Sequence, residues 1–220
     1  MRRKLIAALL IGASVLPALQ GCFPIVAAGV GTGVSAAVDR RSLGTQTEDE
    51  SIEWKAGSRV GDKLKDRGHF NFTSYNRKVL MTGEVVSEDV KAEAERIVSG
   101  IPNVLGVYNE LTIGPSSSLT NRSNDAFITS KVKSRSVDSG KFNALHLKVV
   151  TEAGTVFLLG LFTQAEADAA IHVARTTAGV RKVVPLMEII APAKARELDV
   201  AQSDKKQESG PAPIESRPLP

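Results

Sequence analysis

The sequence predicts an α+β protein made of two copies of one α-β-β-α-β unit. Each copy is expected to form a three-stranded mixed sheet with two helices on one face. The apolar run at residues 155–162 follows a tight turn and precedes a helix start, which is typical of a buried strand. The same order recurs at residues 78–85, and Gly83 and Gly160 lie 160 − 83 = 77 positions apart. A duplication of this length indicates two small domains rather than a solenoid.

The duplication extends beyond the central strands at a separation of 76 positions. One residue gained near the turn and one lost before the last strand account for the difference from 77. The sequence therefore predicts domains at residues 46–114 and 124–192, joined by a linker at 115–123. The matched pairs are Asp49 and Asp125, Ile52 and Ile128, Lys55 and Lys131, Ser58 and Ser134, Arg59 and Arg135, Val104 and Val180, Val107 and Val183, and Ile113 and Ile189.

Each copy contains the start and stop signals of its elements. Thr47 and the acidic residues after it predict a helix start, and Thr163 with Glu166 predicts another. The strand–helix–strand crossover makes its two strands parallel and puts both helices on one face. The other face then needs a cover, which is the second copy, a partner or a membrane. The expected helices are 47–65, 87–99, 124–137 and 164–177, and the expected strands are 70–75, 78–86, 104–113, 143–150, 155–162 and 180–190.

The N-terminus has the form of a secretory signal peptide at residues 1–21. A basic start, Met1 to Lys4, precedes an uncharged apolar run that is too short to favour a membrane-spanning helix. The run ends Leu19-Gln20-Gly21-Cys22, which resembles the lipobox of bacterial lipoproteins, and Cys22 is the only cysteine. This resemblance implies cleavage before Cys22, a thioether-linked diacylglycerol and an N-acyl group. The alternative is an ordinary signal peptide that leaves a free thiol.

The segments outside the two copies are expected to lack a fold. Residues 22–45 are Gly- and Ala-rich and predict a flexible tether, with Asp39-Arg40-Arg41 at lipid headgroups. The glycines at 29, 31 and 33 have no strand before them, which argues against a dinucleotide site. Residues 193–220 are rich in Pro, Gln and Ser without an apolar period, so a disordered tail is predicted.

Charge separates the two copies. Residues 46–114 contain nine basic and twelve acidic residues, a net charge of −3, whereas residues 124–192 contain eight basic and six acidic residues, a net charge of +2. Copies that share a fold but differ in sign suggest different roles.

Motifs of catalysis and metal binding are missing from the sequence. It contains no G-x-S-x-G, H-E-x-x-H or C-x-x-C pattern, and His69, His146 and His172 are far apart. We therefore expect no enzyme, no metal and no cofactor apart from the covalent acyl groups on Cys22. We also expect no nucleic-acid partner.

Further motifs follow one another along nearly the whole mature chain. They are Arg41-Ser42-Leu43-Gly44-Thr45-Gln46, Val79-Leu80-Met81-Thr82-Gly83, Val107-Tyr108-Asn109-Glu110, Ser123-Asn124-Asp125-Ala126-Phe127-Ile128-Thr129, and Val149 to Gly160. With the lipobox, this order resembles the dual BON-domain outer-membrane lipoproteins of Gram-negative bacteria. The resemblance implies no catalysis, binding of anionic phospholipids by the second copy, and a role in outer-membrane integrity at the division site. Phe23, instead of Asp, after Cys22 also favours the outer membrane, at its periplasmic face.

The first helix of the second copy contains the candidate lipid-binding residues. Phe127 lies about 100° around the helix from the inward-facing Ile128. An aromatic ring beside cations suits a headgroup surface, although the same residues also fit a ring that flanks the core among solvated lysines. The first copy has Ser51, Lys55 and Ser58 among acidic residues, a poorer surface for anionic lipid. The candidates are Phe127, Lys131, Lys133, Ser134 and Arg135.

A protein-interaction module is the competing function. In that case sheet edges and an apolar rear face recruit envelope or division proteins, and acylated Cys22 is the only link to the membrane. Binding to vesicles of pure lipid separates the two functions.

Overall fold

The computed structural model describes residues 39–208, without the side chains of 202–208. The expected signal peptide, Cys22, the tether up to residue 38, and residues 209–220 lie outside the described residues. Within the described part, no helix is both long and apolar enough to cross a membrane.

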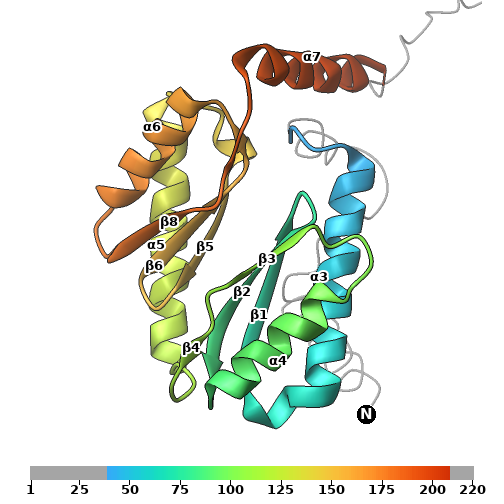
Figure 1. The fold of residues 1–220 in the computed structure, drawn as a ribbon. Coiled ribbons are helices and arrows are strands. Elements are labelled where there is room, and N and C mark those ends of the chain that lie inside the picture. Colours follow the sequence, from blue (N-terminus) through green and yellow to red (C-terminus); the bar gives the residue numbers. More distant parts are fainter. Residues whose placement is uncertain (1–38, 209–220) are drawn as a thin grey trace, which may run out of the picture. The chain divides into compact units, whose positions relative to one another are not determined.

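The first copy folds in the predicted order (Figure 1). β1 pairs antiparallel with β2, and β3 and β4 both pair parallel with β2, as the crossover predicts. The predicted strand at 104–113 is divided because Glu110 N–H donates to Met81 O (2.9 Å) and Leu111 N–H turns to the Asn109 side chain. The elements are α3 (Leu43–Leu64), the 3-10 turn η2 (Lys65–Arg67), β1 (Gly68–Tyr75), β2 (Lys78–Val85), α4 (Glu88–Ser99), β3 (Gly106–Asn109) and β4 (Thr112–Ile113).

The second copy repeats this order with a break in its central strand at Gly160. A Cβ there would lie 2.1 Å from the Phe162 ring and 2.6 Å from His146 O, so only glycine fits. β5 pairs antiparallel with β6, β8 pairs parallel with β6, and β9 pairs parallel with β7. The elements are α5 (Leu119–Ser139), η3 (Ala144–His146), β5 (Lys148–Glu152), β6 (Thr155–Leu159), β7 (Leu161–Phe162), α6 (Gln164–Arg175), β8 (Lys182–Pro185) and β9 (Glu188–Ile189).

The first helix of each copy begins earlier than predicted. Ser42 caps α3 by accepting Thr45 N–H (3.1 Å), and Ser118 caps α5 by accepting Asn121 N–H (3.2 Å). The two caps are 118 − 42 = 76 positions apart, so they belong to the duplication. The prediction of a tether is therefore wrong from residue 43, and the prediction of a linker is wrong from residue 119. In each case a serine caps the helix by accepting a free backbone N–H group, so the helix starts earlier.

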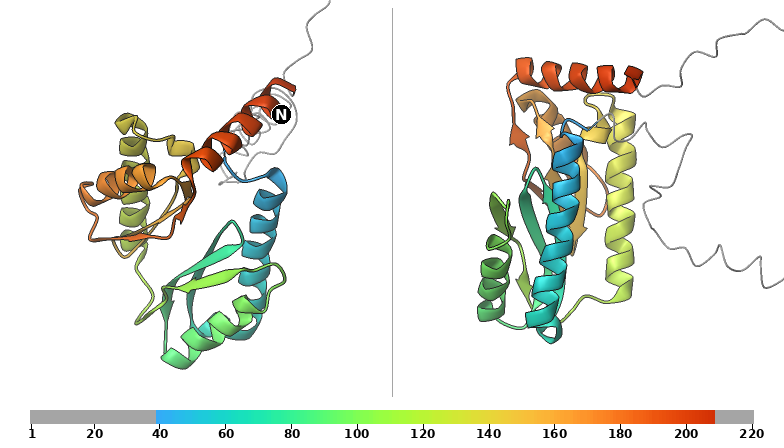
Figure 2. Two further views of the ribbon diagram at one scale, coloured as in Figure 1. Left: turned by 45° about the horizontal axis from the view of Figure 1, so that its top comes forward. Right: turned by 90° about the vertical axis from the view of Figure 1, so that its right-hand side faces the viewer.

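One face of each sheet holds a separate apolar core. In the first copy, α3 and α4 lie on the same side of the sheet and bury the predicted apolar positions against β2 (Figures 1 and 2). The first core contains Ile52, Ala56, Val60, Val90, Ala94, Ile97 and Val98, packed against Val79, Met81 and Val85. The second contains Ile128, Val132, Ala167, Ala170 and Val173, packed against Val156 and Leu158.

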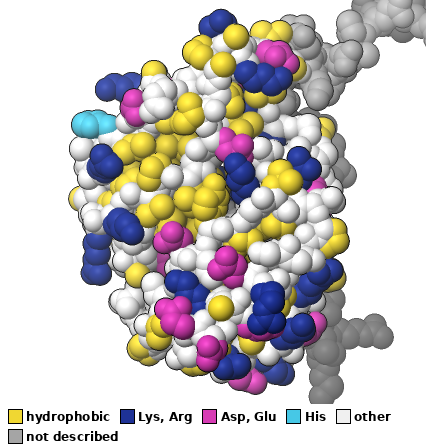
Figure 3. Space-filling view, viewed as in Figure 1, with side chains coloured by type: hydrophobic (Ala, Val, Ile, Leu, Met, Phe, Trp, Pro, Cys, Tyr) yellow, Lys and Arg dark blue, Asp and Glu magenta, His cyan; other side chains and the backbone are white. Residues whose placement is uncertain are grey.

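The opposite sheet faces share a third apolar cluster. Tyr75 and Leu80 of the first copy are buried with Phe157, Leu159 and Leu161 of the second. Of the three expected covers for this face, the structure thus supplies the second copy. Hydrophobic side chains also gather over the strands of the second copy in Figure 3.

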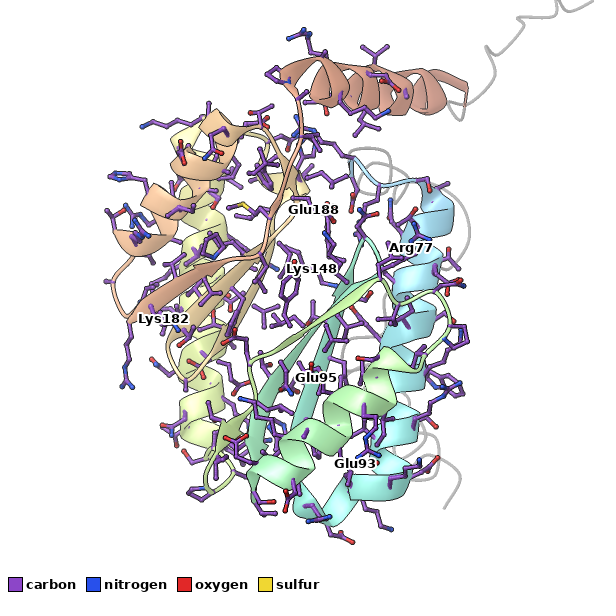
Figure 4. The ribbon with its side chains drawn as sticks, viewed as in Figure 1. Arg77, Glu93, Glu95, Lys148, Lys182 and Glu188 are labelled. Carbon is purple, nitrogen blue, oxygen red and sulfur yellow. The ribbon has the colours of Figure 1, made fainter. Side chains whose placement is uncertain are left out.

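Polar contacts surround this shared cluster. Lys148 Nζ lies 2.9 Å from Glu53 Oε1, and the Asn76 amide donates to Glu188 Oε1 (2.9 Å). Lys78 Nζ approaches the same Glu188 carboxylate at 3.3 Å. Figure 4 labels Lys148 and Glu188 on the strands that contribute to these pairs. Specific polar pairs at the rim of an apolar cluster fix its register.

A helix replaces the start of the predicted disordered tail. Residues Pro192–Glu208 form α7, so the expectation of disorder from residue 193 is wrong over that range. The segment lacks an apolar period, but it is rich in Ala, Lys, Arg, Glu and Gln, which favour helix. Ala195 is buried and Leu198 packs against the shared cluster, so α7 is held by a few contacts rather than by an apolar stripe.

Arg40 is buried in protein rather than at headgroups, which corrects the prediction for Asp39-Arg40-Arg41. Its guanidinium donates to Leu161 O (2.8 Å), to Glu166 of α6 (2.9 Å) and to Asp199 of α7 (2.8 Å). Two carboxylates and a carbonyl thus replace its hydration. Burial by itself raises the pKa of Glu166, but hydrogen bonds from Arg40 and Thr163 outweigh it and lower that pKa to about 2.

Arg41 is also held inside the protein. It pairs with Asp39 (2.6 Å) and with Asp49 of α3 (2.6 Å), and its guanidinium carbon lies 4.0 Å from the centre of the Tyr75 ring. The segment from Asp39 to Arg41 therefore fastens the start of α3 to both copies.

Candidate membrane-binding site

The predicted lipid-binding residues lie on helix α5 outside its buried positions. Ile128 and Val132 are buried, as their spacing predicts. Phe127, Lys133, Ser134 and Arg135 are exposed, and Lys131 is half-buried. The helix runs to Ser139 and ends at Gly140, whose φ of 59° is the left-handed conformation common at helix ends.

Phe127 and Lys131 form one unit on this surface. The Phe127 side chain is 62% exposed, and Lys131 Nζ lies 4.6 Å from the centre of its ring. The same ammonium group donates to Ala178 O at 2.5 Å. The carbonyl thus fixes a cation beside an exposed aromatic ring, an arrangement that suits the boundary between headgroups and acyl chains.

Arg135 is oriented by the end of α6. Its guanidinium donates to Thr177 Oγ1 (2.9 Å) and to Thr176 Oγ1 (3.1 Å). Since a guanidinium has five N–H groups, donors remain for a further acceptor. The hydroxyls hold the planar group in a fixed direction, which favours a defined contact with an anionic oxygen.

Three of the predicted residues line one shallow cavity of about 330 Å³. Lys131, Ser134 and Arg135 come from α5, and the opposite wall follows α6. The sequence did not indicate this wall, because its three residues approach only when α6 packs beside α5. Lys133 is exposed but does not line the cavity, and Cys22 lies outside the described residues. The wall residues are Thr176, Thr177 and Ala178.

The matching surface of the first copy is neutralised. Lys55, the counterpart of Lys131, lies 4.0 Å from Glu48. The counterpart of Glu48 is Asn124, since 48 + 76 = 124, so the second copy keeps the cation and loses the acid. Helix α3 also exposes an aromatic residue, Trp54 (74%), whose counterpart on α5 is Ser130, since 54 + 76 = 130.

No group of three or more His, Cys, Asp or Glu residues among the described side chains is arranged to hold a metal ion. The geometry of α5 instead offers an apolar ring, two fixed cations and a hydroxyl beside a small cavity. Such a set can bind an anionic headgroup by charge and hydrogen bonds while the ring enters the interface.

Comparison with known proteins identifies the repeated unit. The BON domain family matches residues 48–115 and 124–191. The chain is 39% identical over 185 residues to "Outer membrane lipoprotein DolP" of Haemophilus influenzae, which covers 83% of this chain and 95% of the relative. It is 35% identical over 155 residues to "21 kDa hemolysin" of Actinobacillus pleuropneumoniae, covering 70% of this chain and 80% of that one.

A solved structure of CdsD, described as a structural protein of the type III secretion system of Chlamydia trachomatis, covers 64% of this chain and 95% of its own. Its identity is 14% and its TM-score 0.27, too low to support an argument. The two BON matches and the extended identity confirm the resemblance seen in the sequence. The chain therefore belongs to the BON-domain family, as a dual-BON protein of the DolP type.

Proposed function

We propose that the protein is a non-enzymatic outer-membrane lipoprotein that binds anionic phospholipids through α5 of its second BON domain. Acyl chains on Cys22 anchor it at the periplasmic face, and it supports outer-membrane integrity at the division site. The observation that carries the lipid assignment is the exposed Phe127 ring with Lys131 Nζ 4.6 Å from its centre. The predicted site also includes Lys133, Ser134 and Arg135.

The energies favour a weak surface contact that is strengthened by the anchor. Burial of a phenylalanine side chain contributes about 1.5–3 kcal/mol, and each Lys or Arg near an anionic surface about 1 kcal/mol. Together they give a modest, reversible affinity. Acyl chains, which contribute about 0.8 kcal/mol per buried CH₂, supply lasting attachment and hold α5 close to headgroups.

Vesicle binding by charge-reversed variants tests the lipid site. The chain that starts at Phe23 is used, so that no acyl group contributes. Phe127→Glu with Lys131→Glu removes the ring and reverses the fixed cation, so binding to phosphatidylglycerol vesicles should fall by about tenfold or more. Cosedimentation measures the bound fraction.

The first BON domain provides the matched control. Ser51→Glu with Lys55→Glu changes the same charge at the equivalent positions of α3, and we expect it to leave binding nearly unchanged. Equal binding by the parent and the Phe127/Lys131 variant would contradict the assignment. Absence of binding by both chains would leave the acyl groups as the only membrane link, as the envelope-adaptor function requires.

A further inference from the structure

A second, polar cavity of about 450 Å³ lies between the N-terminal half of α5 and the turn from β5 to β6. At its wall stands Asp125, which is 5% exposed. A buried carboxylate is stable when donors or a counter-charge replace its hydration. The lining residues are Ser117, Asn121, Asn124, Asp125, Ala153, Gly154, Gly179, Val180 and Arg181.

The first BON domain shows how the same carboxylate is satisfied there. Asp49, the counterpart of Asp125, accepts backbone N–H groups from Asn76 (2.9 Å) and Arg77 (2.7 Å) in the β1–β2 turn. It also accepts the Ser74 hydroxyl (2.6 Å). The Arg41 guanidinium completes the set at 2.6 Å and neutralises the charge.

The second BON domain keeps the carboxylate and loses the cation. Asp125 accepts N–H groups from Ala153 and Gly154 at 2.9 Å, the equivalents of the first two bonds. The position of Arg41 is taken by Ser117, since 41 + 76 = 117. Among the described side chains, no lysine or arginine forms an ion pair with Asp125, and the cavity opens at this place.

The hydroxyl that donates to the carboxylate in the first domain also has a different partner in the second domain. Thr151 stands where the first domain has Ser74, and its oxygen accepts a hydrogen bond from Thr129 (2.8 Å). Asp125 thus has acceptor capacity that its domain does not use, next to the side-chain amides of Asn121 and Asn124.

Arg181 lines the cavity and Arg122 contacts the lining residue Ser117, but neither forms an ion pair with Asp125. Arg122 donates to Ser117 Oγ (3.2 Å), and Arg181 is held by its backbone N–H on Gly154 O (2.9 Å) with its side-chain stem over Gly154. The first domain has Leu105 at the position of Arg181, since 181 − 76 = 105. The positive charge of Arg181 therefore repels a cation in the cavity and weakens its binding.

We propose that this cavity binds the guanidinium group of an arginine side chain presented by a partner protein. A planar guanidinium is weakly hydrated and offers several N–H donors, so it suits a buried carboxylate flanked by amide oxygens. The first domain performs the same binding within the chain, with an arginine that arrives on the extended segment before the helix cap. In the second domain that arginine comes from outside.

N-acetylarginine N-methylamide is the probe for a protein-borne arginine, titrated into the chain that starts at Phe23. We expect saturable NMR shifts of the Ala153 and Gly154 amide signals. The signals of the Asn76 and Arg77 amides should not shift, because Arg41 already pairs with Asp49 in the first domain. The neutral isostere N-acetylcitrulline N-methylamide should produce no such shifts. Absence of saturable shifts, equal binding of the citrulline analogue, or the same response to inorganic phosphate would each overturn the proposal.

Two substitutions test the charges separately. Asp125→Asn should abolish the response, and Arg181→Leu, which copies the first domain, should tighten binding several-fold. Loss of binding on Arg181→Leu would contradict the repulsion between Arg181 and the bound guanidinium and would overturn the proposal. Tighter binding of free arginine than of the capped probe would overturn the assignment to a partner protein.

An internal arginine provides a test that needs no ligand. Ser117→Arg recreates the position of Arg41, so it should raise the melting temperature by a few degrees and remove the response to the probe. The gain should vanish in combination with Asp125→Asn. A Ser117→Arg chain that is no more stable than Ser117→Gln and still binds the probe would contradict the proposal.

Discussion

Replacement of Asp49 by Ala is expected to lower the free energy of unfolding by about 3–5 kcal/mol, the range for removing one partner of a buried ion pair. Asp49 is 2% exposed and accepts four hydrogen bonds, one of them from Arg41. Its loss leaves two turn N–H groups and a hydroxyl without their acceptor. Urea denaturation followed by circular dichroism measures the change.

Asp125→Ala is the matched control for this prediction. Asp125 accepts two backbone N–H groups and no guanidinium, so we expect a smaller loss of about 1–3 kcal/mol. An Asp49 variant that loses no more stability than the Asp125 variant would show that Arg41 adds nothing to the first domain.

Replacement of Arg40 by Met is expected to cost about 3–5 kcal/mol at neutral pH, because it leaves Glu166 and Asp199 without their shared cation. Because Arg40 joins α6 to α7, the variant should also release α7. Limited proteolysis and thermal unfolding check both effects.

The loss should depend on pH. The pKa of Glu166 is about 2, below its ordinary 4.5, so this carboxylate stabilises the fold above 4.5 and the contribution disappears as the pH falls toward 2. The difference between the parent and Arg40→Met should therefore shrink over that interval. Lys194→Met, which breaks an exposed pair with Glu197, is the control and should cost less than about 1 kcal/mol. An equal loss in the two variants would contradict the role of Arg40.

The repeated unit could be predicted because its signals are local. Gly83 of β2, for example, has a φ of +119°, and a Cβ there would lie 2.0 Å from His69 O, so this position of the central strand requires glycine. Turn residues, alternating apolar positions and the caps at Ser87 and Thr163 also act over a few residues. Ser42 and Ser118 are equally local caps, but the acidic first turn near Thr47 and the polar linker gave stronger signals nearby.

The contacts of Arg40 and α7 could not be predicted in this way. Arg40 lies 126 positions from Glu166 and 159 from Asp199, so only the folded chain brings the three together. An arginine after a tether has the same local sequence whether it faces lipid or carboxylates. The spacing of residues along the helix predicted the α5 surface. The cavity wall that follows α6 could not be predicted in this way, because it forms only when the two helices pack together.

Salt-dependent binding of the unacylated chain to vesicles tests whether α5 binds anionic lipid. We expect the chain starting at Phe23 to bind vesicles that contain phosphatidylglycerol, not to bind pure phosphatidylcholine vesicles, and to dissociate as salt screens the cations of α5. Equal binding to both kinds of vesicle at every salt concentration, or none to either, would contradict it.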